Sequence, residues 1–349
     1  MTNKTRLFLM IAAGILVVGL TTGLVASYMG LSAFALGGAE GPDELRYIPA
    51  DAKVVAYANV RDVMSSELRQ KVRQIRPDHE RQNDFMDRTG IDIERDIDEV
   101  VASVTAMEED AENALIIARG RFDQVRIEGF LREKGGVVSE YHGARLITHD
   151  AQNSSGTSRS REMALAFVEP GLVAFGSGPA VRQAIDRKSG GQNITGNEEV
   201  MGLVRDIDDG NAWAVGRFDE IARSARLPQE VANQIPPINW FAASGHVNGG
   251  VRGHLRAEAR DETAAQNLRD VIRGFVALAR LQSGNAPQLA TIIDSLQLGG
   301  EGKTVSLAFA FPPEVIDMLG ALGKRHADRD DHPEVEPPQQ PEPPQPPQN

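Results

Sequence analysis

The tetrapeptide Gly120-Arg121-Phe122-Asp123 occurs a second time as Gly216-Arg217-Phe218-Asp219. Each copy follows a short apolar run typical of a β-strand and precedes a spacing of apolar residues typical of a helix. A looser third copy, Asn59-Val60-Arg61-Asp62, follows the apolar run at 54–58. We therefore interpret the folded part of the chain as a duplication, in which the first two copies lie at matching helix starts.

The aspartate that ends each copy has a structural explanation. An aspartate just before a helix accepts a hydrogen bond from a free backbone N–H group of the first turn, which contributes ~1 kcal/mol. We expect Asp62, Asp123 and Asp219 to be helix N-caps of this kind. Asp261 is expected to cap the amphipathic pattern that runs to Gln282.

The remaining helix and strand signals predict the fold class. Helical spacings occur at 62–76, at 123–134, from Pro179, at 261–282 and from Pro312. Strand-like runs occur at 97–106, 137–148, 162–168, 171–176, 239–247, 251–259, 293–299 and 303–311. This order predicts an α+β fold of two related β-α-β-β-α-β-β-α units with antiparallel-rich sheets. We place them at 53–190 and 211–323, joined by a linker at 191–210.

The N-terminal part of the chain reads as a membrane anchor. Residues 7–36 contain no charge, and 22 of these 30 residues are apolar, which exceeds the ~20 residues that span a bilayer. Lys4 and Arg6 precede this run, and the acidic residues Glu40, Asp43 and Glu44 follow it, so we expect a cytoplasmic stub at 1–6 and an extracytoplasmic remainder that begins with a linker at 37–52. The alternative is a cleaved signal peptide, whose apolar region is shorter, at ~7–15 residues.

Small residues form a stripe within the expected anchor. Gly19, Gly23, Ala26 and Gly30 fall on one side of a helix, and the first two form a G-x-x-x-G pair. This spacing predicts a contact between two anchor helices and hence a homodimer. The alternative is that glycine is simply common in membrane helices.

The C-terminal residues 324–349 have a different composition. They include eight prolines between Pro333 and Pro347 and no aromatic residue. Such a segment buries too little apolar surface to fold, so we expect a disordered polyproline-II tail that reaches on the order of 50 Å and contacts an unknown protein partner.

Composition excludes several classes of function. The 349-residue chain has no cysteine, which excludes disulfides, thiolate metal sites and cysteine nucleophiles. Its 49 acidic and 37 basic residues give a net charge of −12, and only 5% of its residues are aromatic. We therefore expect no nucleic-acid partner, because phosphate neutralisation and base stacking both lack suitable residues.

The remaining candidate motifs for ligand binding or catalysis lack the residue spacing that those sites require. Gly300-Glu301-Gly302-Lys303-Thr304 lacks the first glycine and the helix of a phosphate-binding loop, and reads as a hairpin turn. A two-residue turn near Asn248 would place His246 and His254 on opposite faces of a hairpin, while Glu140 and His142 would share a strand face as a surface pair. We predict no catalytic residue, no cofactor and no metal site.

The segment Tyr47-Ile48-Pro49-Ala50-Asp51-Ala52, followed by a strand and a helix, resembles uncharacterised bacterial envelope proteins. These have one N-terminal membrane segment and an extracytoplasmic domain of unknown function, so the resemblance implies the bacterial inner membrane and no activity. Our hypothesis is a single-pass, membrane-anchored extracytoplasmic binding or scaffold protein. The alternative is an anchored extracytoplasmic hydrolase whose active site matches no motif, which would require a convergent catalytic cluster.

Overall fold

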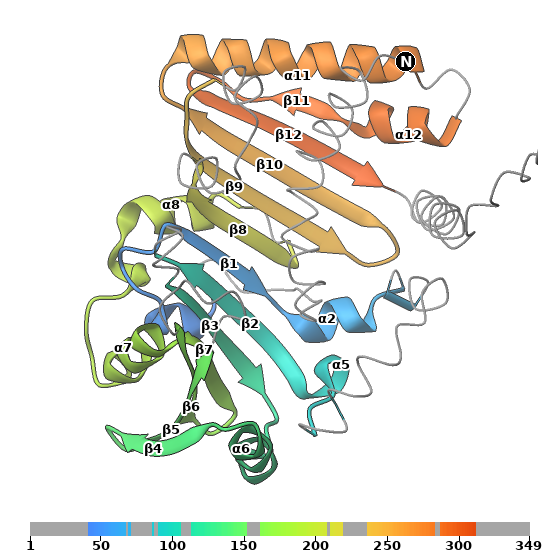
Figure 1. Ribbon diagram of the computed structural model, residues 1–349. Coiled ribbons are helices and arrows are strands. Elements are labelled where there is room, and N and C mark those ends of the chain that lie inside the picture. Colours follow the sequence, from blue (N-terminus) through green and yellow to red (C-terminus); the bar gives the residue numbers. More distant parts are fainter. Residues whose placement is uncertain are drawn as a thin grey trace, which may run out of the picture.

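We describe the protein from a computed structural model (Figure 1). The described residues are 41–67, 69–70, 86, 90–105, 113–151, 161–207, 210–218, 236–282 and 287–311. The expected anchor at 7–36 with its stripe Gly19, Gly23, Ala26 and Gly30, the capping residue Asp219 and the tail at 324–349 lie outside them. None of the helices within the described ranges has both the length and the apolar character needed to cross a membrane.

Twelve strands form one sheet in the order β11-β12-β10-β9-β8-β1-β2-β3-β7-β6-β5-β4. The strands are β1 (Val54–Ala58), β2 (Ile97–Val104), β3 (Ala114–Gly120), β4 (Val137–Tyr141), β5 (Ala144–Ala151), β6 (Arg161–Glu169), β7 (Leu172–Ser177), β8 (Ala212–Arg217), β9 (Ile238–Val247), β10 (Val251–Ala259), β11 (Gln297–Gly299) and β12 (Thr304–Phe311). Every neighbouring pair in this order is antiparallel.

Helices lie on both faces of this sheet. They are the 3₁₀ turns η1 (Asp43–Tyr47) and η2 (Ile194–Gly196), and the helices α2 (Val60–Ser65), α5 (Ile93–Asp96), α6 (Gln124–Glu133), α7 (Gly178–Lys188), α8 (Glu198–Arg205), α11 (Glu262–Gln282) and α12 (Pro287–Ser295). Figure 1 shows α11 along one edge of the sheet and α6 beside the opposite edge.

The predicted fold class is wrong, because the two halves do not form separate units with their own sheets. Strands β1 and β8 pair along their whole length, from Val54 opposite Gly216 to Ala58 opposite Ala212. In two separate units each of these strands would expose a row of unpaired backbone groups. Pairing them satisfies those groups and joins the halves into one antiparallel sheet.

The two halves nevertheless follow the same path outward from the β1–β8 pair. One half runs β1-β2-β3-β7-β6 and the other runs β8-β9-β10-β12-β11. In each half the third strand of this path, β3 or β10, pairs with the strand that comes last along the chain, β7 or β12. The repeated tetrapeptide does not follow this correspondence, because Gly120 ends the third strand of its half while Gly216 lies in the first strand of the other. The helix start that matches Asp123 is therefore Asp261.

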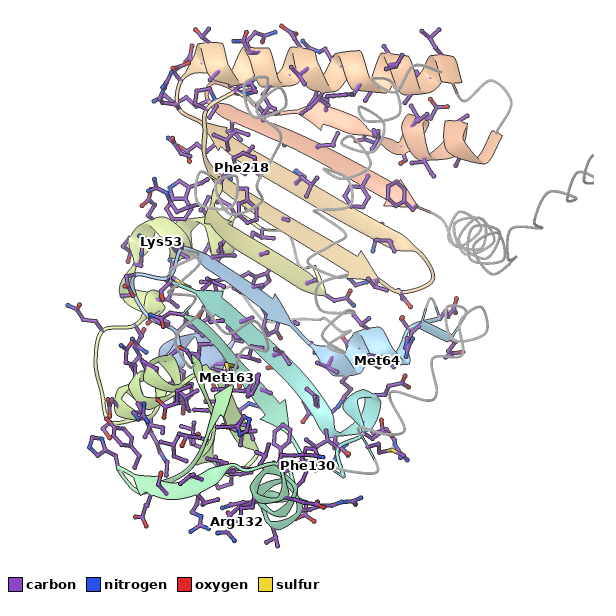
Figure 2. The ribbon with its side chains drawn as sticks, in the orientation of Figure 1. Lys53, Met64, Phe130, Arg132, Met163 and Phe218 are labelled. Carbon is purple, nitrogen blue, oxygen red and sulfur yellow. The ribbon has the colours of Figure 1, made fainter. Side chains whose placement is uncertain are left out.

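The two faces of the sheet differ in what covers them. The face that bears Tyr57, Ile117 and Trp213, here called the tyrosine face, packs against η1, α7, η2 and α8 in the main core. The opposite face, which bears Ala56 and Ala214 and is here called the alanine face, carries α6 and α11 near its two edges. Figure 2 shows Phe130 and Arg132 of α6 at one edge, and Met64 of α2 near the start of β2.

Candidate functional site

One row of apolar side chains crosses the whole alanine face, with one residue from each strand. In sheet order it consists of Val138, Ile147, Leu165, Phe175, Ile116, Ala102, Ala56, Ala214, Ala243, Leu255, Leu307 and Leu298. Four alanines occupy the centre, and larger side chains stand on both sides. The row is symmetric about the β1–β8 pair, since Ile116 and Leu255 occupy equivalent places in the two halves.

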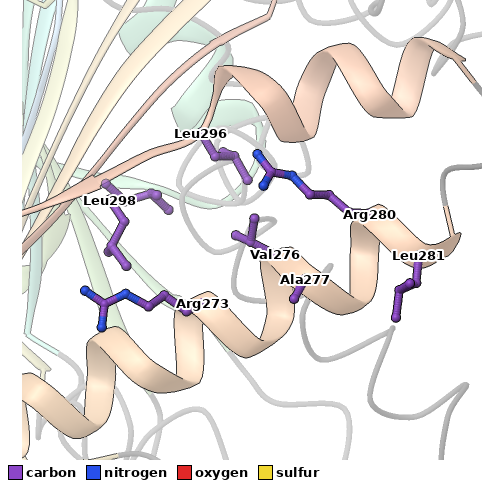
Figure 3. Close-up of a pocket in the computed structure, with 8 residues that line it drawn as sticks. Arg273, Val276, Ala277, Arg280, Leu281, Leu296 and Leu298 are labelled. Carbon is purple, nitrogen blue, oxygen red and sulfur yellow. The ribbon is translucent and has the colours of Figure 1, made fainter.

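The row ends in a pocket between α11 and the last strands (Figure 3). The pocket has a volume of about 510 Å³, which lies within the ~300–1,000 Å³ typical of small-molecule sites. Leu298 and Leu307, the last two residues of the row, form part of its wall. The other lining residues are Arg273, Val276, Ala277, Arg280, Leu281 and Leu296.

Two arginines give this apolar pocket a cationic rim. Arg273 Nη1 lies 2.9 Å from Asp270 Oδ1, and Arg280 Nη2 lies 3.3 Å from Asp294 Oδ1. Both arginine side chains are 59% exposed, and ion pairs at such positions contribute only ~0–1 kcal/mol. Arg273 can therefore exchange its aspartate partner for the anionic group of a ligand at little cost.

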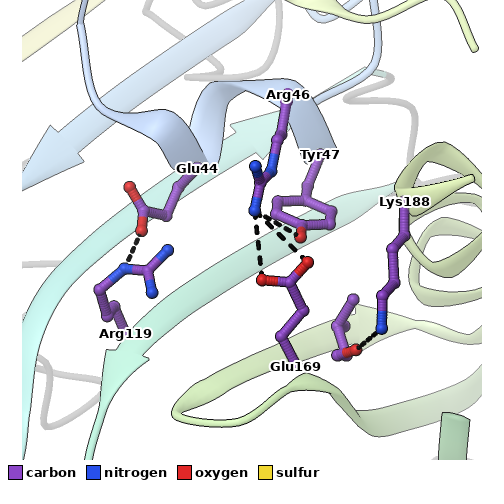
Figure 4. A network of polar contacts seen from close by, with 7 residues as sticks. Glu44, Arg46, Tyr47, Arg119, Glu169 and Lys188 are labelled. Atoms are coloured by element: carbon purple, nitrogen blue, oxygen red, sulfur yellow. Dashed lines mark hydrogen bonds and ion pairs between the residues drawn. The ribbon is translucent and has the colours of Figure 1, made fainter. Parts of the chain in front are cut away.

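A buried polar cluster lies on the other side of the sheet, under η1 (Figure 4). The Glu44 side chain is 1% exposed and accepts a hydrogen bond from Arg119 Nε. Arg119 in turn lies opposite Glu99 in the β2–β3 pair. Burial raises the pKa of Glu99, and the carboxylate of Glu44 raises it further, while a hydrogen bond with Tyr57 and the charge of Arg119 act in the opposite direction.

A second set of contacts holds the end of η1. Arg46 Nη2 donates to Tyr47 Oη at 3.1 Å and to Glu169 Oε2 at 3.2 Å. Burial, followed by a hydrogen bond with Glu169, raises the pKa of Tyr47 to about 12. Lys188 Nζ donates to the backbone oxygen of Val168 at 2.8 Å. These contacts hold the entry of the chain against the sheet, so we assign this cluster a structural role.

The predicted helix caps have different outcomes. Asp123 Oδ1 accepts a hydrogen bond from the Arg126 N–H group at 3.0 Å, and Asp261 Oδ1 accepts one from the Ala264 N–H group at 2.8 Å. That backbone hydrogen bond lowers the pKa of Asp261. The expectation for Asp62 is wrong, because α2 begins at Val60 and Asn59 Oδ1 accepts from the Asp62 N–H group instead.

The expected arrangement of His246 and His254 is also wrong. Three residues, Asn248 to Gly250, connect β9 and β10, so His246 lies opposite Arg252 and His254 opposite Ser244. Both histidines therefore face the same side of the sheet. The prediction was wrong because it assumed a two-residue turn, and one additional turn residue reverses the face on which a side chain lies. In the described ranges no three His, Asp or Glu side chains are grouped so that they could bind a metal.

Glu140 and His142 do not form the expected pair. His142 lies in the β4–β5 turn with φ of 47°, so the predicted strand at 137–148 is two strands. Its Nδ1 atom lies 2.7 Å from Asp186 Oδ1, whereas Glu140 lies opposite Arg145. The predicted hairpin turn at Gly300–Thr304 is confirmed, because it connects β11 and β12 and the Thr304 N–H group donates to Glu301 O at 2.9 Å.

Comparisons with protein-family models, with curated proteins and with solved structures found no match to this chain. Sequence reasoning missed both the apolar row and the pocket. The available signal was an alanine at the middle of several strand-like runs, as at Ala56, Ala102 and Ala214, but its meaning depends on which strands are neighbours.

Proposed function

We propose that this chain is a non-catalytic binding protein for an anionic single-chain amphiphile, such as a long-chain fatty acid. The observation that supports this is the pocket of about 510 Å³ with leucine and valine walls and two arginines at its rim. The acyl chain would lie against Val276, Leu298 and Leu307, and the carboxylate would pair with Arg273 and Arg280.

The energetics favour a ligand of this mixed character. Each buried CH₂ group contributes ~0.8 kcal/mol, so an acyl chain in an apolar pocket supplies most of the affinity. A guanidinium group can hold a carboxylate through two parallel hydrogen bonds, which orients the head group. Neither the burial of the acyl chain nor the pairing of its carboxylate requires a chemical reaction.

The sequence suggests where this binding takes place. We further propose that residues 7–36 hold the chain in the bacterial inner membrane with the bulk of it outside the cytoplasm, as the charge pattern around this segment predicts. A pocket on a membrane-tethered domain meets amphiphiles that partition into the bilayer at a high effective concentration.

The test uses the full-length chain in phosphatidylcholine nanodiscs and a dansyl-labelled undecanoic acid as the probe. We expect saturable binding to the wild type and at least about a tenfold loss of affinity in Arg273→Gln/Arg280→Gln. Val276→Trp should weaken binding because the indole takes up part of the wall that the acyl chain would contact. The matched control is Arg205→Gln, which removes an arginine from a comparable surface ion pair with Glu198 on α8 and should bind normally.

Two results would overturn this function. Equal affinity of the wild type and both pocket variants would show that the probe binds elsewhere. Release of free acid from an ester of the probe, at a rate that depends on the protein, would instead favour the alternative of a hydrolase.

A further inference from the structure

The tyrosine face is polar in the second half at places where it is apolar in the first. Leu115 and Ile117 of β3 lie on this face, are fully buried and belong to the main core. By the symmetry of the two halves, the equivalent places on β10 hold His254 and Arg256. Both of these side chains are only partly buried. Because an apolar contact would leave their polar groups without hydrogen bonds, this part of the face favours a polar ligand.

Four basic side chains lie together here, and we call them the basic row: His246, Arg252, His254 and Arg256. The three that belong to β10 are alternate residues, so they project from the same face at intervals of ~6.8 Å. His246 of β9 lies directly opposite Arg252. Ser306 of β12 lies opposite Arg256 and adds a hydroxyl group. All five side chains can donate hydrogen bonds, and a histidine does so in either protonation state.

Most donors of the basic row lack a partner in the part of the chain that the structure describes. Among those residues, the side chains of His246, Arg252 and His254 make no hydrogen bond and no ion pair. Arg256 pairs through Nη1 with Asp206, but its Nε atom is buried and has no hydrogen-bond partner there. A buried donor without an acceptor costs free energy, so a ligand with several acceptor oxygens would stabilise this arrangement.

Two acidic side chains limit the extent of the basic row. Asp206, at the C-terminal end of α8, pairs with Arg256, but the two side chains are 52% and 31% exposed, and such a pair contributes only ~0–1 kcal/mol. Glu258 follows Arg256 by two residues on the same face and ends the row. Positive charge is therefore concentrated around Arg252. The whole chain has a net charge of −12, so an anion that binds here is held by these local groups and not by the overall charge.

We infer that the basic row is a binding site for a small molecule that carries two linked phosphate groups. The long side chains of Arg252 and Arg256 flank His254, so both guanidinium groups can bend toward a ligand above it. Each guanidinium can hold one phosphate through two parallel hydrogen bonds. A diphosphate supplies the negative charge and the acceptor oxygens that two arginines and two histidines require. The site lies on the face opposite the fatty-acid pocket, so it does not depend on the proposed function.

Calorimetric titration of the full-length chain in phosphatidylcholine nanodiscs with pyrophosphate tests this site. We expect saturable binding to the wild type and at least about a tenfold loss of affinity in Arg252→Gln/Arg256→Gln. His246→Gln/His254→Gln should lose about threefold or more. The matched control, Arg132→Gln, removes an arginine from an exposed ion pair on α6 at the opposite edge of the sheet and should bind normally. Absence of binding, or equal affinity of the wild type and the double arginine variant, would overturn the site.

A second titration separates this site from the pocket and identifies the source of the diphosphate group. The pocket variant Arg273→Gln/Arg280→Gln should bind pyrophosphate as the wild type does, and loss of binding in this variant would assign the pyrophosphate to the pocket and overturn the site. Farnesyl diphosphate is then added to the same variant in nanodiscs. Displacement of pyrophosphate at a concentration at least about tenfold lower than free pyrophosphate requires would support a lipid-borne ligand. Equal potency would support a soluble one.

Discussion

Tyr57 and Trp213 lie opposite each other across the β1–β8 pair, with ring centroids 5.6 Å apart. Tyr57 is fully buried and Trp213 nearly so, and both belong to the main core. The contact joins the first strand of one half to the first strand of the other. The two halves therefore share one hydrophobic core at the centre of the sheet.

This shared core predicts a single cooperative unfolding transition. Ile117→Ala, in the first half, should lower the free energy of unfolding by ~2–5 kcal/mol, because Ile117 is fully buried. Both tryptophans of the chain, Trp213 and Trp240, lie in the second half. In urea, tryptophan fluorescence and far-ultraviolet circular dichroism should shift together. A fluorescence midpoint that does not move would mean that the halves unfold separately.

Removal of the Arg119 guanidinium group under η1 should lower the free energy of unfolding. Arg119→Met leaves the carboxylate of Glu44 buried without its partner, which we expect to reduce the free energy of unfolding by ~3–5 kcal/mol. The control is Arg46→Met, which removes a half-exposed arginine from its pair with Glu169 and should cost ~0–1 kcal/mol. Urea denaturation at pH 7 measures both. Similar effects of the two substitutions would contradict the role of burial.

The raised pKa of Glu99 predicts a pH-dependent effect of its removal. A carboxyl group whose pKa is raised in the folded state stabilises the fold while protonated, and this contribution is lost as pH rises through the folded pKa. Glu99→Gln should therefore increase stability relative to the wild type at pH 7. The difference should disappear as pH falls below the ordinary glutamate pKa of ~4.3. Unfolding curves between pH 4 and pH 8 provide the measurement, and an advantage that grows toward low pH would contradict the prediction.

Two glycines that face each other on the alanine face should tolerate alanine differently. A Cβ atom on Gly253 would lie 2.2 Å from the nearest ring carbon of Phe309, whereas one on Gly245 would meet its nearest atom at 3.9 Å. Gly253→Ala must displace the aromatic ring and should cost ~1–3 kcal/mol. Gly245→Ala should leave the melting temperature nearly unchanged. A tolerated Gly253→Ala would show that the Phe309 ring moves freely.

Local features were predictable from the sequence because they depend on neighbours a few residues away. The residue range of β10 coincides with the predicted strand at 251–259, whose start follows the turn signal at Asn248-Gly249-Gly250. The hydrogen bonds of Asp123 and Asp261 reach only three residues along the chain. The same local reasoning misplaced Asp62, since the helix begins two residues before it and Asn59 supplies the capping oxygen.

The repeated tetrapeptide predicted local structure but did not identify equivalent strands in the two halves. The tetrapeptide at Gly120 and Gly216 marks the end of a strand in both places. It does not identify equivalent strands, because any strand that leads into a helix favours the same residue types.

The sequence by itself determined where single strands, turns and two of the helix caps form, because these depend on backbone preferences and on hydrogen bonds within a few residues. Only the tertiary structure decided that β1 pairs with β8 and that Glu44 meets Arg119, 75 residues away. It also decided that Leu298 and Leu307 border a pocket. An apolar strand can pair with many others, and burial of backbone and side-chain groups in the whole sheet selects among them.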